Sequence, residues 1–312
     1  MCSISGMLTT KALPLSGASI GRMLVGGAHR GEFSAGVWTP RGRVRRMGHP
    51  KKLVGARDFW GVFPARLALA HTRWPTSGGQ TVKDTQPFTE GGVTTTHNGH
   101  LFQPAALAKE VGVKWAAGDV DSVLWTRAAA RYGAEGLRMV AEAAYGSDAV
   151  AALIDGTVYL YRGHGAALCF GVWAGGVMWG SEAEMVRSGL ACIDIRAVVY
   201  QVPADVVCEV VLGTQPGVVE RLKVERDGWA GSDVGLCDDG SGLYDGGRWP
   251  IEEEETARRA QHIGEPRPMW AGGKGYIVAE GRRWAKCADG VWREVKAARK
   301  RGRRWNRRGG VR

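Results

Sequence analysis

Short apolar runs, rather than long helical repeats, dominate the first 213 residues of this 312-residue chain. Apolar runs of about four to eight residues bounded by glycine are typical of buried strands. We predict strands over eight segments: Cys2–Thr9, Ala35–Thr39, Arg66–Ala70, Val93–Thr96, Ala149–Ile154, Val158–Tyr161, Ala197–Val202 and Val206–Val211. No run approaches the roughly 20 apolar residues of a membrane-spanning helix. The chain is therefore expected to be rich in strands and to have no membrane partner.

Helical segments lie between these strands. In Asp119–Tyr132 the apolar residues recur three and four positions apart, which is the spacing of an amphipathic helix. Leu137–Ala144 and Glu182–Ser188 are predicted to be helical as well. Strands and helices in this mixture indicate the α+β class.

The composition changes after Gly213 and divides the chain into three parts. Residues 2–213 form the predicted main domain, and residues 214–292 form a linker rich in Gly and Asp with a small extension. In this extension we expect a short helix over Glu252–Arg259 and a hairpin at Asp289-Gly290, because Asp-Gly between alternating runs favours a tight turn. Residues 293–312 form a basic tail, predicted to be disordered.

The formal net charge of +11 is concentrated in that tail, where residues 293–312 contain ten basic residues and one acidic residue. Arginine and lysine bind phosphates independently of sequence, so one hypothesis is a nucleic-acid or acidic partner. The other is a solvated tail that only improves solubility.

The cysteine pattern indicates a reduced, cytoplasmic protein without a metal centre. The chain has six cysteines, none in a C-x-x-C pair, and no histidine at zinc-like spacing. The first residues contain no long apolar segment typical of a secretory signal. Most of these cysteines are expected to be small core residues.

Cys2 differs from the other cysteines because it follows Met1. Its small side chain permits removal of the initiator methionine, which would leave a cysteine with a free α-amino group. That group titrates at about 7.7–8.0 and a free thiol near 8.5, so one residue can supply both nucleophile and base. The plain alternative is that Cys2 only begins the first strand.

Five motifs follow Cys2 in a fixed order. They are His29–Gly36 (HRGEFSAG), His71–Gly78 (HTRWPTSG), Gln86–Phe88 (QPF), His97–His100 (HNGH) and Gly118–Ser122 (GDVDS). In this order and spacing, the region from Cys2 to about Gly213 resembles the class II glutamine amidotransferases. The resemblance implies the four-layer αββα sandwich of the N-terminal-nucleophile hydrolases.

The resemblance also implies catalytic roles for three residues. Cys2 would attack the side-chain amide of glutamine and form a thioester. The side-chain amide of Asn98 and the backbone N–H of Gly99 would stabilise the oxyanion. Glycine suits that position because it tolerates positive φ and brings no Cβ between backbone and substrate.

Four further residues are expected to bind glutamine. The planar guanidinium of Arg73 matches the α-carboxylate, and Thr76 would add a hydroxyl to it. Asp121 is the candidate for the α-ammonium group. Asp119 is a competing choice, or the N-cap of the following helix. Trp74 lies where the family has a mobile loop that closes over the substrate.

Several positions depart from the family pattern. These are Ser3, Phe33, Pro75, Ser77, His100 and Val123. None of them removes the nucleophile, the oxyanion pair or the arginine, so glutamine-dependent amidotransfer without a cofactor is the expected function.

The residues after Gly213 are too few for the family's usual acceptor domains, and a separate synthetase or acceptor subunit is the expected partner. Two other functions stay open: hydrolysis of a different amide by the same fold, and binding without catalysis. The presence of Arg73 argues against the first, and that of Cys2 and Asn98 against the second.

Overall fold

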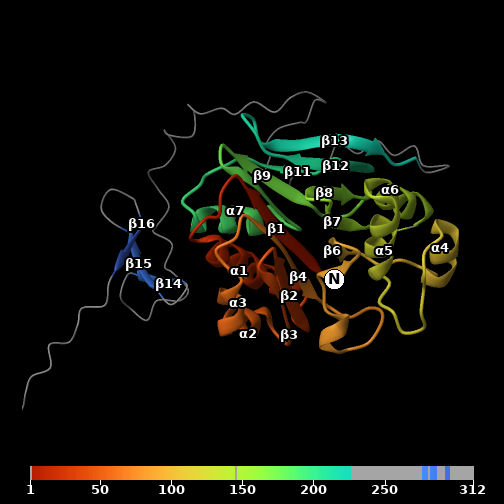
Figure 1. The fold of residues 1–312 in the computed structure, drawn as a ribbon, viewed down its shortest axis with the longest axis horizontal. Helices are drawn as coiled ribbons and strands as arrows, with labels where there is room; N and C mark the ends of the chain where they lie inside the picture. The colour runs from red at the N-terminus through yellow and green to blue at the C-terminus, as the bar shows by residue number, and fades with distance from the viewer. Residues whose placement is uncertain (1, 145, 226–275, 280–281, 287–291, 296–312) are drawn as a thin grey trace, which may run out of the picture. The chain divides into compact units, whose positions relative to one another are not determined.

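A computed structural model describes residues 2–144, 146–225, 276–279, 282–286 and 292–295. The chain divides into two compact units, Met1–His262 and Ile263–Arg312. The first unit contains two antiparallel sheets with helices packed on their outer faces (Figure 1).

The first sheet has seven strands in the order β11-β9-β10-β1-β4-β2-β3. Its strands are β1 (Ser3–Thr9), β2 (Ser34–Thr39), β3 (Gly42–Met47), β4 (Leu67–Arg73), β9 (Cys169–Trp173), β10 (Gly176–Gly180) and β11 (Val199–Gln201). The second sheet has six strands in the order β13-β12-β8-β7-β6-β5. Its strands are β5 (Phe88–Glu90), β6 (Val93–Asn98), β7 (Ala149–Ile154), β8 (Thr157–Arg162), β12 (Val206–Val211) and β13 (Gly217–Lys223).

Helices cover the outer face of each sheet. The seven-stranded sheet is covered by α1 (Ser16–Gly26), α2 (Pro50–Val54), α3 (Arg57–Gly61) and α7 (Ala183–Cys192). The six-stranded sheet is covered by α4 (Pro104–Val111), α5 (Val123–Tyr132) and α6 (Ala134–Ala143). Two short 3₁₀ turns, η1 (Gly27–Arg30) and η2 (Val82–Asp84), complete the described helical elements. The resulting order of helices, sheet, sheet and helices confirms the predicted four-layer α+β sandwich.

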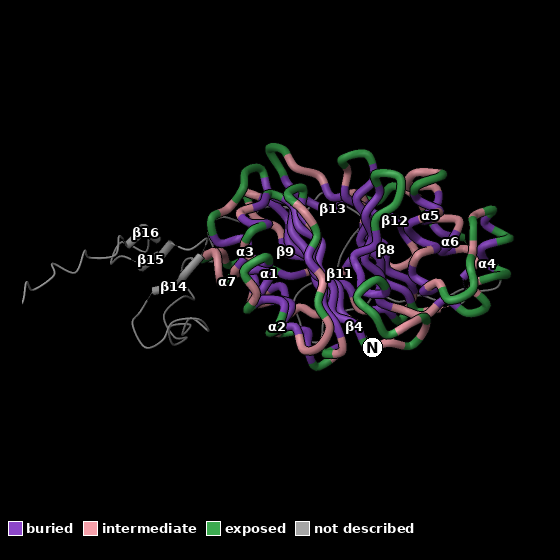
Figure 2. Tube along the Cα trace, turned by 60° about the horizontal axis from the view of Figure 1, so that its bottom comes forward, coloured by how far each residue is buried: buried purple, intermediate pink, exposed green. Residues whose placement is uncertain are grey.

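The core explains why the predicted strands are continuously apolar. In β7, Ala149, Ala151 and Leu153 face the opposite sheet, whereas Val150, Ala152 and Ile154 face the helices. Strands buried on both faces lose the alternation of polar and apolar residues that half-exposed strands show. Figure 2 shows the buried strands in the middle of this unit and the exposed residues in its loops.

All eight predicted strands are present, with ends that differ by up to three residues. Five further strands were not predicted: β3, β5, β9, β10 and β13. The helix predicted from Asp119 begins instead at Val123, because Asp119 and Val120 are not helical and Asp121 and Ser122 lie in a turn. Strand β13 pairs with β12 in the six-stranded sheet, so that sheet continues beyond Gly213.

In the second unit, the described residues form a three-stranded antiparallel sheet of β14 (Tyr276–Ala279), β15 (Arg282–Lys286) and β16 (Trp292–Val295). Strands β15 and β16 flank Asp289-Gly290 and pair with each other, as expected of a hairpin. The predicted helix over Glu252–Arg259, the turn itself and the tail beyond Val295 lie outside the described residues. Within the described ranges, no helix has both the length and the apolar character needed to cross a bilayer.

Candidate functional site

Cys2 lies at the beginning of the central strand β1, where the two sheets approach each other. The register pairs Ser3 with Thr72, which places Cys2 beside Arg73 at the end of β4. Asn98 is the last residue of β6 in the opposite sheet. Residues that are distant in sequence therefore come together at one end of the sandwich.

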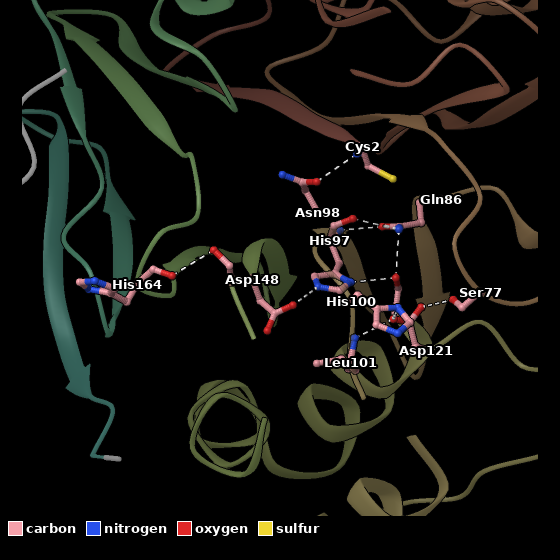
Figure 3. Close-up of polar contacts among 12 residues, drawn as sticks. Cys2, Ser77, Gln86, His97, Asn98, His100, Leu101, Asp121, Asp148 and His164 are labelled. Atoms are coloured by element: carbon pink, nitrogen blue, oxygen red, sulfur yellow. Dashed lines mark hydrogen bonds and ion pairs between the residues drawn. The ribbon is translucent and has the colours of Figure 1, made fainter. Parts of the chain in front are cut away.

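The backbone nitrogen of Cys2 and the side chain of Asn98 are in direct contact. The nitrogen donates to Asn98 Oδ1 at 3.1 Å (Figure 3). Because the oxygen accepts from Cys2, the Nδ2 group of the same amide remains a donor. Removal of Met1 would turn this nitrogen into the α-amine without changing its neighbour.

The thiol of Cys2 contacts the backbone of Trp74 twice. The Trp74 N–H donates to Sγ at 3.4 Å, and Sγ lies 3.5 Å from the Trp74 carbonyl oxygen. Burial raises the pKa of the Cys2 thiol, while the backbone bond from Trp74 and the charge of Arg73 oppose that rise. A thiol with a raised pKa needs a base before it can attack.

Arg30 and Glu182 fix the other end of the Cys2 backbone. Arg30 Nε donates to the Cys2 carbonyl at 3.0 Å, and its NH1 donates to Glu182 Oε1 at 2.9 Å. Burial alone would raise the pKa of Glu182, but the hydrogen bonds from Arg30 and His29 hold it below the usual value. Arg30, which belongs to the HRGEFSAG motif, thus links the Cys2 backbone to Glu182 and holds it in place.

Arg73 organises the loop that follows β4. Its guanidinium donates to the carbonyl oxygens of Ser77 at 2.7 Å and Gly79 at 2.9 Å. Burial lowers the pKa of Arg73, and the negative groups Asp84, Cys2 and Asp121 oppose the shift. Two of its donors are used by the loop, so the remaining ones are available for a ligand.

Trp74 and Thr76 lie on this loop and face solvent. The side chain of Trp74 is 51% exposed, although its backbone contacts the Cys2 thiol. An exposed tryptophan beside a half-buried thiol fits the expected covering loop better than a core residue.

The two candidate aspartates have different surroundings. Asp121 is buried, accepts from the Leu101 N–H at 2.8 Å and from the Ser77 hydroxyl, and lies 3.5 Å from His100 Nδ1. Asp119 instead pairs with Arg127 at 2.6 Å. Of the two aspartates, Asp121 is the one whose charge contributes to the raised pKa of the Cys2 thiol. The geometry therefore favours Asp121, and it lies before α5 rather than in the first turn of that helix.

Gly99 is required for a different reason than the one expected. Its φ is not positive. A Cβ at this position would overlap Asp148 Oδ1 and His97 Nε2. The absence of a side chain makes room for these buried groups rather than permitting an unusual backbone conformation.

The sequence did not identify the buried network behind Asn98. Gln86 accepts from the His97 N–H at 2.6 Å and donates to the His97 carbonyl at 3.0 Å, and His97 contacts Ser122 and Asp148 (Figure 3). The QPF motif pointed to Gln86. Asp148 gave no signal, because it is a single acid before an apolar strand. Among the described residues, no three His, Cys, Asp or Glu side chains are grouped to hold a metal ion.

Comparisons with known proteins show partial sequence matches. No protein-family model matches the chain. Amidophosphoribosyltransferase of Drosophila melanogaster is 34% identical over 98 residues, which cover 28% of this chain and 18% of that protein. Glutamine–fructose-6-phosphate aminotransferase (isomerizing) of Xylella fastidiosa is 33% identical over 104 residues, which cover 32% of this chain and 16% of that protein. The chain thus matches less than a quarter of the length of these relatives.

Solved structures extend the likeness to the fold. The glutamine phosphoribosylpyrophosphate amidotransferase of B. subtilis superposes with a TM-score of 0.54 at 14% identity, over 70% of this chain and 49% of that one. A structure described as the allosteric regulatory enzyme of purine biosynthesis gives a TM-score of 0.56 at 15% identity, with the same coverage. The partial sequence matches and the shared fold together support a class II glutamine amidotransferase domain with the N-terminal-nucleophile fold.

Proposed function

We propose that the chain hydrolyses the side-chain amide of glutamine at Cys2 and delivers the ammonia to an acceptor on a separate subunit. The contact between the Cys2 nitrogen and Asn98 carries this proposal. It holds nucleophile, base and oxyanion donor within one small group of atoms, which acyl transfer requires.

The reaction would begin with attack of Cys2 Sγ on the amide carbon. The α-amine of Cys2 takes the thiol proton, and the Nδ2 group of Asn98 and the N–H of Gly99 donate to the oxyanion. The carbon–nitrogen bond then breaks, and the α-amine passes the proton to the departing ammonia. Water adds to the resulting thioester and releases glutamate, which restores the thiol.

Glutamine would be held by its two charged groups. The free donors of Arg73 would bind the α-carboxylate, with Thr76 as an additional donor. The Asp121 carboxylate would bind the α-ammonium group. Because the Ser77 hydroxyl also donates to this carboxylate, the ammonium group and the hydroxyl would compete for it. Trp74 would cover the occupied site, because its side chain is exposed and its backbone contacts the thiol.

The acceptor and the cellular compartment are inferred from the cysteines, the relatives and the basic residues. Described cysteines are all free, which fits the reducing cytoplasm. The matched relatives are named as transferases, which supports transfer of the ammonia to an acceptor. The basic residues after Val295 are the part of the chain suited to an acidic or nucleic-acid partner.

Release of glutamate from glutamine by the purified chain tests this function. Cys2→Ser should abolish release, whereas Cys192→Ser, which alters another half-buried thiol, should leave it intact. Faster release of ammonia from another amide would support the alternative amidohydrolase. Glutamine binding without turnover and without alkylation of Cys2 would support a binding protein.

A further inference from the structure

A buried chain of hydrogen bonds lies on the helix-facing side of β6. Gln86 Nε2 lies 3.2 Å from Ser122 Oγ, and Ser122 Oγ lies 2.8 Å from His97 Nδ1. His97 Nε2 lies 2.8 Å from Asp148 Oδ1. A carboxylate only accepts, so Nε2 is the donating nitrogen and Nδ1 accepts from the Ser122 hydroxyl. The chain of donors thus runs in one direction, from Gln86 to Asp148.

The hydrogen-bonded pair of His97 and Asp148 at the end of this chain is shielded from water. The side chains of His97 and Asp148 are 0% and 1% exposed. The second oxygen of Asp148 has no hydrogen-bond partner among the described residues. A buried carboxylate with one unsatisfied oxygen costs stability, so its presence calls for a role beyond packing.

The register of the sheet places Asp148 beside the candidate oxyanion donors. Asn98 pairs with Ala149, and therefore Gly99 lies opposite Asp148. A Cβ on Gly99 would overlap both Asp148 Oδ1 and His97 Nε2. The carboxylate and the imidazole therefore rest directly against the Gly99 backbone.

The alternation of side chains along β6 separates this network from the thiol. The Asn98 side chain reaches Cys2, whereas the preceding His97 points to the helix layer and packs on Trp125 with ring centroids 5.7 Å apart. His97, Ser122 and Asp148 resemble a hydrolytic triad in composition. All three are buried behind the strand, so they cannot touch a substrate at Cys2.

We propose that Asp148, acting through His97, is a positioning residue that holds the Asn98–Gly99 backbone in the orientation needed to donate to the oxyanion. This inference rests on the proposed glutaminase reaction. It states that His97 and Asp148, which lie outside the oxyanion site, determine the orientation of the donors in that site. Gln86 holds both backbone polar groups of His97, and the Asp148 pair holds its ring. The residue before Asn98 is thereby fixed at both backbone and side chain.

Loss of the Asp148 contact should destabilise the transition state rather than weaken the binding of glutamine. The removal of one oxyanion donor typically costs about 10²–10³ in rate. Asp148→Ala only loosens the donors, and we expect kcat for glutamine hydrolysis to fall about tenfold to a hundredfold. KM for glutamine and the rate of Cys2 alkylation by iodoacetamide should change by less than about threefold, because the substrate anchors and the thiol are untouched.

A matched control separates positioning from general stability. A buried hydrogen bond of 2.6 Å joins Thr95 of β6 to Thr126 of α5. Thr95 lies two residues before His97 on the same strand. Thr126→Val removes this bond and should lower the thermal midpoint without lowering kcat. Asp148→Asn keeps an oxygen that accepts from His97, and it should restore part of the kcat lost in Asp148→Ala.

The measurements are kcat, KM, alkylation rate and thermal midpoint for the wild type and the three variants. An unchanged kcat in Asp148→Ala would overturn the inference, as would an equal loss of kcat in Thr126→Val. If Asp148→Ala does not fold, a fully active Asp148→Asn would also overturn it, because the neutral amide is expected to restore only part of kcat, and a loss of kcat at constant KM would support it. A wild type without glutaminase activity would instead overturn the proposed function.

Discussion

The backbone nitrogen of Cys2 lies 3.1 Å from Asn98 Oδ1, across the gap between the two sheets. This contact fixes which atom of the Asn98 amide faces Cys2 and leaves the Nδ2 group to donate elsewhere. The nitrogen is a peptide nitrogen while Met1 is attached and a titrating amine once it is removed. Maturation would therefore convert a structural hydrogen bond into part of the reaction.

We accordingly predict that the active protein lacks Met1. An α-amine with a pKa of about 7.7–8.0 can exchange protons near neutral pH, whereas a peptide nitrogen cannot. Intact-mass measurement of the purified protein should show a chain beginning at Cys2, and the glutaminase rate should scale with the fraction of processed chains. A fully active preparation that retains Met1 would contradict the single-residue mechanism.

Replacement of Arg73 by Ala should raise KM for glutamine. A hydrogen bond to a charged group contributes about 1.5–3 kcal/mol, which corresponds to an increase of about tenfold to a hundredfold. Alkylation of Cys2 by a small uncharged reagent should be preserved.

Arg45→Ala is the matched control for Arg73→Ala, because Arg45 also donates to two carbonyl oxygens, those of Lys83 and Thr85. It should leave KM unchanged. If Arg73→Ala abolishes alkylation together with turnover, the role of Arg73 is to hold the loop rather than the substrate.

The two aspartates of the GDVDS motif should respond differently to the same change. Asp121→Asn removes the negative charge proposed to bind the α-ammonium group and should raise KM by about tenfold or more. Asp119→Asn breaks a partly exposed pair with Arg127 and should cost at most about 1 kcal/mol of stability, with KM unchanged. Steady-state kinetics of both variants decide the assignment. An increase of KM in Asp119→Asn alone would reverse it.

Sequence patterns predicted many of the buried strands because both of their faces are apolar, although the glycine-containing β9 and β10 were missed despite their burial. Strands such as β7 and β12 have the predicted ends. Edge strand β3, GRVRRM, was missed because its arginines lie at the border of the sheet, where one side of the strand is exposed. Strand β13 was missed because polar residues interrupt it after the first buried positions.

Only those residues of the candidate site that belong to local sequence motifs could be predicted. Cys2, Arg73 and Asn98 lie within recognisable segments, and the sheet register brings them together. The contact of Asp148 with Gly99 depends on the pairing of β6 with β7, which are about fifty residues apart. No local pattern encodes that pairing, so the buried acid behind the oxyanion site required the structure.

His71 should make folding sensitive to acid. Burial lowers its pKa from the ordinary value of 6.5 to about 3, although the bond of Nε2 to the His97 carbonyl opposes the shift. Between these two values the unfolded chain binds a proton that the folded chain excludes. The free energy of unfolding therefore falls as the pH falls through this window, by about 1.4 kcal/mol per pH unit.

The variant His71→Gln isolates this contribution. Glutamine does not titrate and keeps a donor for the His97 carbonyl, so the decline in stability between pH 6.5 and 4 should become shallower. Chemical denaturation of both proteins at several pH values measures the difference. The same pH slope in wild type and variant would show that other groups cause the acid sensitivity.

Deletion of residues 296–312 should separate the basic tail from the glutaminase reaction. This segment begins directly after β16 and contains nine Lys and Arg residues and no acidic residue. The proposed site residues all precede Ser122, and charges more than about 8–10 Å apart are largely screened at physiological salt, so glutamate release should be nearly unchanged. Binding to a DNA duplex should fall in the deletion, and DNA binding by the full chain should weaken steeply with added salt.

The matched control is a full-length variant in which four arginines of the tail are replaced by Gln: Arg303, Arg304, Arg307 and Arg308. This variant keeps the length of the chain and Trp305 but loses positive charge. Loss of glutamate release on deletion would overturn the proposed division of the chain, and DNA binding that does not depend on salt would contradict the electrostatic role of the tail.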